Sequence, residues 1–218
     1  EAEMISLVFT NSSPAMPVWG GKEKFLGASP FAAAIPGGDK GPFSLDMACT
    51  VTARGKLKYA AQRGEKIKPG LALDKYGKPT TDGNEAFQGV ILPFGGVKGS
   101  ALAMLMEILC GVFTGAAFAG DVKNPHTDLS GPQNVGHFFM AMKPDLFMSM
   151  KEFRSRMDTL VTRAKACRKA EGFEEIFIPG EIESKTAADR RKNGIPLTQD
   201  VVDVLKREAE LAEIEWKK

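Results

Sequence analysis

The chain has 218 residues, of which 43% are hydrophobic and 26% are charged, which excludes a disordered or fibrous protein. Its 29 Lys and Arg residues nearly balance its 27 Asp and Glu residues, so the net charge of +2 gives no electrostatic reason to expect nucleic acid or an anionic membrane as partner. The three cysteines lie far apart, which disfavours disulfide and zinc sites and favours a reducing cytoplasm, and two histidines alone cannot build a metal cluster.

The first hundred residues predict short strands joined by tight turns. Strand composition marks Ile5–Thr10, Phe31–Ile35 and Phe43–Met47, and turns rich in Gly, Pro and Asp lie at residues 36–39, 77–79 and 82–84. Apolar and basic residues over 53–63 predict a short helix closed by Gly64. The chain enters its first strand almost at once without an initiator Met, so we expect that a preceding piece was removed or is carried on another polypeptide.

The longest apolar stretch, residues 101–119, predicts a central helix over about 99–119. Its length alone would permit a membrane span, but Glu107 and the many Ala and Gly residues favour a buried helix of a globular protein. Gly111, Gly115 and Ala119 form a small-residue ridge, which indicates either tight core packing or a packed helix pair at a subunit interface.

The last third predicts helices. Ser149 and Glu152 form a capping box, and the helix that follows is expected to end at Gly172. Residues 176–178 resemble a return strand, a polar surface segment follows residue 181, and Thr198 starts a final helix whose apolar face extends to Trp216. Strands in front and helices behind indicate an α/β or α+β protein, with a core over residues 1–150 and a helical portion over 151–218 that completes the same fold.

Nucleotide-binding motifs of the common kinds are absent. No two glycines are separated by a single residue, which excludes GxGxxG, and Lys98 is followed by Gly rather than Ser or Thr, which excludes a Walker loop. Lys98 nevertheless lies where the central helix begins, in the glycine cluster of residues 95–100. The N–H groups of residues 98–100 and the lysine charge predict an anion site there, with a glycine-rich turn and a solvated lysine as the alternative.

Two further side chains are candidates for binding. Asp46 ends a strand, and either caps the next helix or accepts hydrogen bonds from ligand hydroxyls. Arg54 suits a substrate carboxylate, although arginines in such positions are commonly structural. His126 is expected in a loop, and His137 is expected to be a core histidine rather than a catalyst.

Ten segments, in their order along the chain, resemble the malate/L-lactate dehydrogenase family that lacks a Rossmann fold. They are residues 10–14 (TNSSP), 19–21 (WGG), 27–31 (GASPF), 45–48 (LDMA), 53–56 (ARGK), 79–82 (PTTD), 92–99 (LPFGGVKG), 136–139 (GHFF), 179–181 (PGE) and 194–197 (GIPL). The family includes sulfolactate, ureidoglycolate and diketogulonate dehydrogenases and reductases of cyclic imino acids. The resemblance implies a family-specific, non-Rossmann α/β domain that binds NAD or NADP, with a mixed sheet packed with helices.

The resemblance also implies roles for individual residues. Cofactor contacts fall on Asp46, Met47, Ala48, Val97, Lys98, Gly180 and Glu181, and substrate contacts fall on Ala28, Arg54 and Gly55. Ala28 departs from the Thr that many members carry. Lys56 matches the malate-like members, whereas the imine reductases carry an Asp there, which argues against imine reduction.

The proton-donating His of the family lies in a region N-terminal to this chain, so no catalytic residue is assigned here. We therefore expect the cofactor-binding part of an NAD(P)-dependent oxidoreductase that acts on a small 2-hydroxy or 2-oxo acid, without a metal and without a membrane or nucleic-acid partner. We expect it to work as a homodimer or with a separate N-terminal fragment. A non-catalytic cofactor-binding or assembly subunit, and an imino-acid reductase, are the alternatives.

Overall fold

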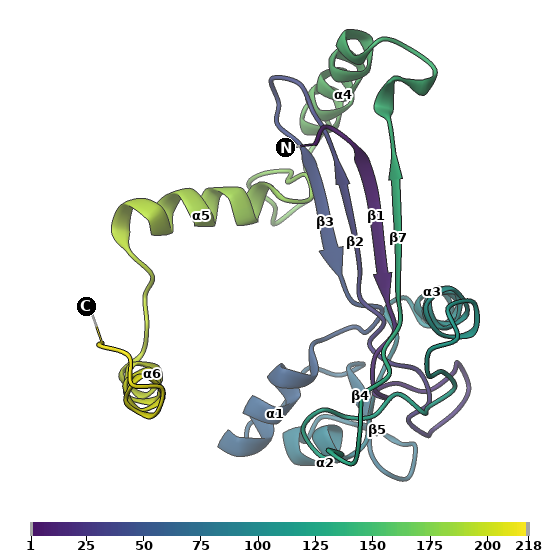
Figure 1. The fold of residues 1–218 in the computed structure, drawn as a ribbon, viewed down its shortest axis with the longest axis vertical. Coiled ribbons are helices and arrows are strands. Elements are labelled where there is room, and N and C mark those ends of the chain that lie inside the picture. The colour runs from purple at the N-terminus through teal and green to yellow at the C-terminus, as the bar shows by residue number, and fades with distance from the viewer. Residues whose placement is uncertain (1, 217–218) are drawn as a thin grey trace. The chain divides into compact units, whose positions relative to one another are not determined.

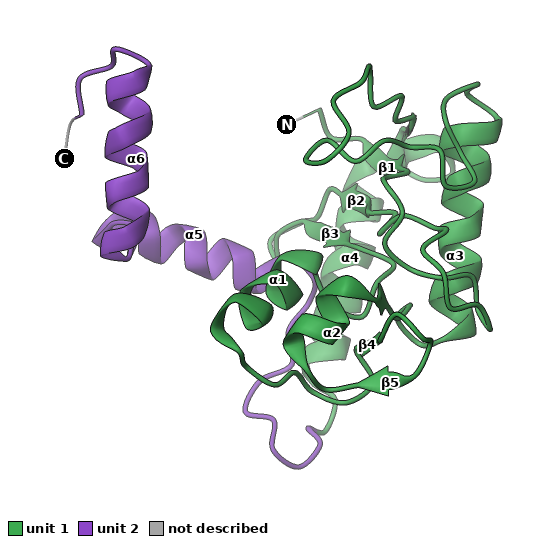
Figure 2. Ribbon diagram, turned by 90° about the horizontal axis from the view of Figure 1, so that it is seen from below, with its two compact units in different colours: residues 1–168 green, residues 169–218 purple. Residues whose placement is uncertain are grey.

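The computed structural model describes residues 2–216. The chain divides after Arg168 into two compact units (Figure 2). The division falls later than the expected one after residue 150, because helix α4 (Met150–Lys165) belongs to the first unit. The Asp158 carboxylate on α4 accepts the backbone N–H groups of Asp39 at 3.0 Å and Lys40 at 2.9 Å, which fixes α4 to the turn over residues 36–42.

The main sheet contains β1 (Ile5–Thr10), β2 (Phe31–Ile35), β3 (Phe43–Met47) and β7 (His137–Met142), in the order β3-β2-β1-β7 (Figure 1). The three predicted strands are confirmed with the predicted bounds. Leu7 of β1 faces Ala33 of β2 on one side and Met140 of β7 on the other. Every strand pairing among the described residues is antiparallel, so the expectation of a mixed sheet is wrong in that respect, while the combination of sheets and helices is confirmed.

A smaller sheet lies with two helices beyond the ends of the main strands (Figure 1). It contains β4 (Ala72–Leu73), β5 (Pro79–Thr80) and β6 (Val90–Ile91), and it packs with α1 (Arg54–Arg63) and α2 (Gly83–Gln88). Gly64 closes α1 as predicted, because its φ of 63° lets its N–H reach back to the carbonyls of Ala60 and Ala61. The shared apolar cluster is formed by Leu57, Ala72, Ala86 and Ile91.

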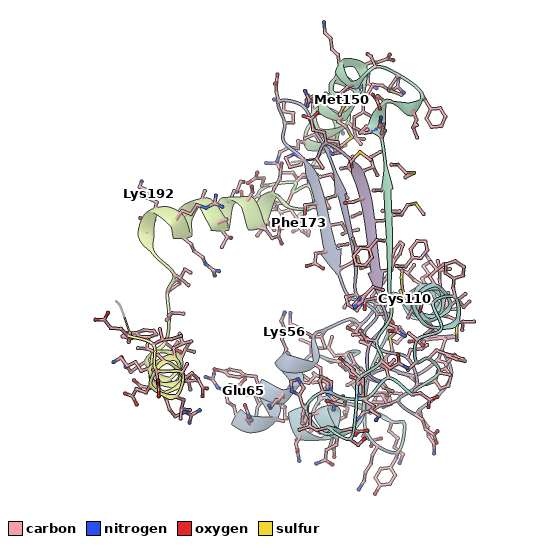
Figure 3. The ribbon with its side chains drawn as sticks, viewed as in Figure 1. Lys56, Glu65, Cys110, Met150, Phe173 and Lys192 are labelled. Carbon is pink, nitrogen blue, oxygen red and sulfur yellow. The ribbon has the colours of Figure 1, made fainter. Side chains whose placement is uncertain are left out.

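The central helix is shorter than predicted. Helix α3 (Val97–Glu107) passes into a π-helical turn, η1 (Ile108–Val112), and the helix ends there rather than at residue 119. Gly115 has a φ of 75°, which ends the helical path, and the Thr114 hydroxyl donates to the Cys110 carbonyl at 2.5 Å. Cys110 lies beside the lower end of β7 (Figure 3).

One side of this helix faces the core and the other is exposed, so the expectation of a buried central helix is confirmed for one side only. Ala103, Met106 and Cys110 are buried, whereas Leu105 is 45% and Ile108 is 48% exposed. None of the helices in the described part of the chain is long and apolar enough to cross a membrane.

Helix α4 follows a short 3₁₀ turn, η2 (Pro144–Leu146). The Ser149 hydroxyl accepts the Glu152 N–H at 3.2 Å, which confirms the Ser149 half of the capping box. The helix ends at Lys165 rather than at Gly172, because the Cys167 N–H bonds the carbonyl of Ala164 three residues back and tightens the last turn.

The second unit contains α5 (Glu181–Asn193) and α6 (Gln199–Leu211). The strand expected at residues 176–178 is not formed, because the Ile178 N–H donates to the Glu181 carboxylate instead of to a neighbouring strand. Helix α6 starts after Thr198 as predicted, although the Thr198 side chain makes no capping hydrogen bond, and the helix ends before Trp216.

Candidate cofactor and substrate site

Backbone hydrogen bonds join three of the predicted site segments. The Cys49 N–H donates to the Ala28 carbonyl at 2.8 Å, and the Phe94 N–H donates to the Cys49 carbonyl at 3.0 Å. These bonds place Ala28, the end of β3 and the turn before α3 side by side. The structure therefore brings together the residues expected at the substrate, Ala28, and at the cofactor, Met47–Ala48 and Val97–Lys98.

Gly99 allows α3 to start directly against this backbone. A Cβ atom at Gly99 would lie 2.4 Å from the Phe94 carbonyl oxygen and 3.0 Å from the Cys49 carbonyl oxygen, both far inside van der Waals contact. No side chain fits there without moving the main chain. The distance between the start of the helix and the end of β3 is thus set by glycine.

The glycine-rich turn does not offer the free amides that the sequence predicts. The N–H groups of Lys98, Gly99 and Ser100 donate to carbonyls of residues 94–96, at 3.4, 3.0 and 3.2 Å. Gly95 and Gly96 have φ values of 57° and 63°, which fold the turn back on itself and direct these amides inward. The anion site expected from those amides is therefore wrong, and what remains is the charge of Lys98.

Lys98 itself is suitably placed for an anion. Its side chain is exposed at the first turn of α3, and no hydrogen bond or ion pair joins it to another described residue. The positive end of the helix dipole reinforces its charge. The neighbouring Trp19 turn stabilises this corner, because the Trp19 N–H donates to the Ser100 hydroxyl at 2.9 Å.

Asp46 lies within β3, where it pairs with Ala32. It does not cap a helix: the N-cap position of α1 is Ala53, and no side chain satisfies that helix start. The Asp46 carboxylate is exposed and makes no hydrogen bond with a described residue. The capping role considered for Asp46 is therefore wrong, and its binding to a ligand hydroxyl stays a prediction.

Arg54, at the start of α1, contacts α2 rather than the end of β3. Its guanidinium carbon lies 5.3 Å from the centre of the Phe87 ring. Lys24 approaches the same helix and donates to the Gln88 carbonyl at 3.1 Å. Burial and the nearby Arg54 charge both lower the pKa of Lys24. Gly55 has open space on its Cβ side, so the surface next to Arg54 is accessible.

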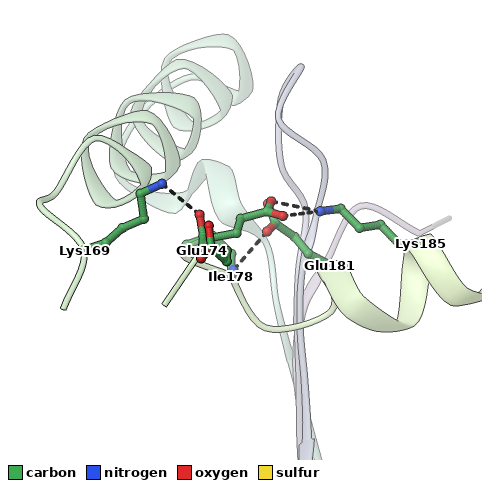
Figure 4. Close-up of polar contacts among 6 residues, drawn as sticks. Lys169, Glu174, Ile178, Glu181 and Lys185 are labelled. Carbon is green, nitrogen blue, oxygen red and sulfur yellow. Dashed lines mark hydrogen bonds and ion pairs between the residues drawn. The ribbon is translucent and has the colours of Figure 1, made fainter. Parts of the chain in front are cut away.

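Gly180 and Glu181 lie in the second unit, where α5 begins. Gly180 has a φ of 95°, and the Glu181 carboxylate accepts the Ile178 N–H at 3.1 Å (Figure 4). Nearby, Lys185 forms an ion pair with Glu175 at 2.8 Å, and Lys169 donates to the Glu174 carbonyl. The contribution of Gly180 and Glu181 to cofactor binding stays a prediction.

The two histidines lie apart from this cluster. His137 is exposed on the edge strand β7, with its ring 6.1 Å from that of Phe139, so the expectation of a core histidine is wrong. His126 lies in a turn, as expected. Among the described residues there is no group of His, Cys, Asp and Glu side chains that could hold a metal ion.

The sequence interpretation assigned no role to two buried polar residues beside the Gly27–Ser29 turn. Asn11, 1% exposed, donates to the Ala117 carbonyl at 2.7 Å and accepts the Gly136 N–H at 2.9 Å. Glu107, 5% exposed, accepts the Ala119 N–H at 3.2 Å. A lone carboxylate within an apolar run is the feature of the sequence that could have identified Glu107.

Comparison with known proteins identifies relatives over nearly the whole chain. The family profile described as malate/L-lactate dehydrogenase matches residues 1–206. The L-sulfolactate dehydrogenase of Methanocaldococcus jannaschii is 43% identical over 204 residues, covering 94% of this chain and 58% of that protein. The solved sulfolactate dehydrogenase structure from the same organism superposes with a TM-score of 0.86 at 41% identity, covering 98% of this chain and 60% of that one.

The names of two further relatives include a cofactor. The ureidoglycolate dehydrogenase (NAD(+)) of Escherichia coli O157:H7 is 31% identical and covers 94% of this chain and 58% of its own length. The (2R)-3-sulfolactate dehydrogenase (NADP(+)) of Chromohalobacter salexigens is 32% identical and covers 93% of this chain and 58% of its own length. The chain thus spans about three-fifths of the length of these relatives.

Proposed function

Because the chain belongs to the malate/L-lactate dehydrogenase family, we propose that it is the cofactor-binding part of an NAD(P)-dependent oxidoreductase. Its reaction would transfer hydride between the nicotinamide ring and the carbon that carries the hydroxyl or oxo group of a small 2-hydroxy or 2-oxo acid. The observation that carries the proposal is the backbone connection of Ala28, Cys49 and Phe94, which unites the expected substrate and cofactor segments.

The charges and the solvent exposure of the described site residues suit a dinucleotide. Lys98 presents an unpaired ammonium group at a helix N-terminus, which suits a phosphate. The exposed Asp46 carboxylate suits a ribose hydroxyl, and Met47 is half-buried at the same strand end. NAD and NADP both remain open, and relatives with each cofactor name are known.

Within this proposal, each residue binds or orients rather than reacts. Lys98 would hold the phosphates, Asp46 a ribose, and Arg54 with Gly55 the substrate carboxylate, while Gly180 and Glu181 would add cofactor contacts. The bound nicotinamide would supply the hydride. Proton transfer needs a donor with a pKa near neutrality, and we assign it to a histidine outside residues 1–218, on a separate segment or chain that completes the enzyme.

The cellular setting and assembly are part of the same proposal. Cys49, Cys110 and Cys167 are free thiols, which suits a reducing cytoplasm. A separate N-terminal fragment would supply the histidine that donates the proton, and a homodimer of this chain is the alternative assembly.

A titration with NADH tests the proposal. Lys98→Ala removes one charge-assisted contact, worth about 1.5 kcal/mol, and should weaken NADH binding about tenfold without changing the melting temperature. The equally exposed Lys58→Ala on α1 is the control and should bind NADH as the native chain does. Unchanged NADH affinity in Lys98→Ala would place the cofactor elsewhere, and no binding by the native chain would refute the proposal.

A non-catalytic binding subunit is the second candidate. It is favoured by the position of His126 and His137, whose imidazoles make no hydrogen bond with any described residue. An assay of the native chain with NADH and oxaloacetate, alone and mixed with any N-terminal fragment that copurifies, separates the two. Turnover in the mixture supports the oxidoreductase, and cofactor binding without turnover in either sample supports the subunit.

A further inference from the structure

Glu107 is a buried carboxylate at the junction between α3 and the π-helical turn η1. It is 5% exposed, and among the described residues no Lys, Arg or His forms an ion pair with it. A π-turn inside an α-helix is an uncommon geometry that often occurs at functional sites. An apolar side chain of similar size would fill this position without the cost of burying a charge.

The hydrogen-bond partners of the Glu107 carboxylate among the described residues are main-chain amides. Its Oε2 atom accepts the Ala119 N–H at 3.2 Å, and the Gly27 N–H also faces it. Burial raises the pKa of Glu107, and the two amides oppose that rise because they favour the charged form. The side chain therefore connects two loops that flank the helix, one before Ala28 and one after η1.

The loop on the Ala28 side is tightly constrained. A Cβ atom at Gly27 would lie 2.4 Å from the carbonyl oxygen and from the hydroxyl of Ser12. Ser29 is fully buried with a φ of 44°, and its hydroxyl donates to the Gly27 carbonyl at 3.3 Å. A turn held in such a conformation keeps its position only while its surroundings fix it.

Ala28 lies in the middle of this turn, and its carbonyl accepts the Cys49 N–H at 2.8 Å. A shift at Gly27 would therefore move Ala28 relative to the end of β3. Displacements of about 1 Å in a positioning group can change rates or affinities severalfold to a hundredfold.

We propose that Glu107 is a positioning residue that holds the Gly27–Ser29 turn, and through it Ala28, at the substrate end of the site. The inference rests on the proposed function, because it takes Ala28 as a substrate contact. Glu107 itself is buried behind the turn and acts through Gly27. It sets the affinity for the 2-oxo acid and not the affinity for NADH, whose contacts lie at the ends of β3 and at Lys98.

The test compares two ligands in the native chain and in Glu107→Gln. Glutamine keeps the size of the side chain but replaces one acceptor oxygen with an N–H₂ group, so one of the two loops loses its partner. NADH affinity is measured by fluorescence, and oxamate, an unreactive analogue of pyruvate, is then titrated into the NADH complex. Hydrogen exchange of the Gly27 and Ser29 amides reports the turn directly. Thr80→Val is the matched control, since it removes a buried side-chain hydrogen bond, to Glu85 at 2.6 Å, in the smaller sheet.

Glu107→Gln should weaken oxamate binding about tenfold or more and speed exchange at Gly27, while NADH affinity stays within about twofold of native. Thr80→Val should leave both affinities unchanged. Three results would each overturn the positioning role. They are an oxamate affinity of Glu107→Gln equal to that of the native chain, an equal loss of affinity for NADH and for oxamate, and failure of Glu107→Gln to fold. If the native chain binds NADH but not oxamate, the inference fails alone; if it binds neither, the proposed function fails with it.

Discussion

Gly99→Ala tests whether the start of α3 depends on a close approach that only glycine allows. In an ordinary helix the change from Gly to Ala stabilises by about 1 kcal/mol. At Gly99 the new Cβ would lie 2.4 Å and 2.8 Å from the Phe94 oxygen and nitrogen, and these are main-chain atoms that cannot rotate away. Overpacking of this kind costs about 3 kcal/mol at the upper end of its usual range, which leaves a net loss of about 2 kcal/mol.

Gly55→Ala is the matched comparison, because Gly55 also lies in the first turn of a helix but has no atom within 4 Å of its Cβ position. It should stabilise by up to about 1 kcal/mol. Urea denaturation of both variants measures the difference, and Gly99→Ala should melt about 4–8 °C below the native chain. NADH affinity should fall in Gly99→Ala, since Lys98 moves with the helix. Equal stabilisation by both substitutions would refute the close-packed geometry.

Three further predictions concern separate parts of the chain. Leu57→Ala removes a side chain that is 1% exposed and should destabilise by about 2–5 kcal/mol in urea denaturation. Leu211→Ala, 73% exposed, should change stability by less than about 0.5 kcal/mol, and similar losses in both would contradict the assigned core. Burial raises the pKa of Glu107 above its ordinary value of 4.5, so the Glu107 carboxyl stays protonated to higher pH in the folded chain than in the unfolded chain. The free energy of unfolding should therefore fall as pH rises from 4.5 through the pKa of the folded state. Glu107→Gln should lack that fall, and parallel pH profiles of the urea midpoint would show that another group is responsible. Asp158→Ala frees the turn that carries Asp39 and Lys40, so trypsin should cleave after Lys40 faster than in the native chain, and an unchanged cleavage rate would mean that α4 does not hold this turn.

Local sequence patterns were sufficient to predict three strands of the main sheet and some of the helix boundaries. Strand composition and flanking turns predicted the bounds of β1, β2 and β3 correctly. Ser149 and Gly64 correctly indicated the start of α4 and the end of α1. The ends that depend on tertiary contacts were missed. The end of the central helix could not be predicted from the apolar run, because it depends on the contact of η1 with Gly136. A Cβ atom at Gly136 would lie 1.6 Å from the Cys110 carbonyl oxygen.

The candidate site shows the same limit. The resemblance pointed to Ala28, Met47, Ala48, Val97 and Lys98, and the structure brings these segments together. The direction of the amides at residues 98–100 could not be predicted, because it depends on the left-handed conformations of two consecutive glycines. The hydrogen-bond partners of Glu107 could not be predicted, because they are main-chain amides of other segments, which a residue pattern does not reveal.

The segments of the site are joined by main-chain bonds, from the Cys49 amide to the Ala28 carbonyl and from the Phe94 amide to the Cys49 carbonyl. Bonds of this kind do not depend on which side chains the same residues carry. A different side chain at position 28 would therefore leave these main-chain bonds intact, and under the proposed substrate role of Ala28 it would change which acid binds best. If the proposed role holds, one backbone arrangement could accept several chemically related acids through changes at a single side chain.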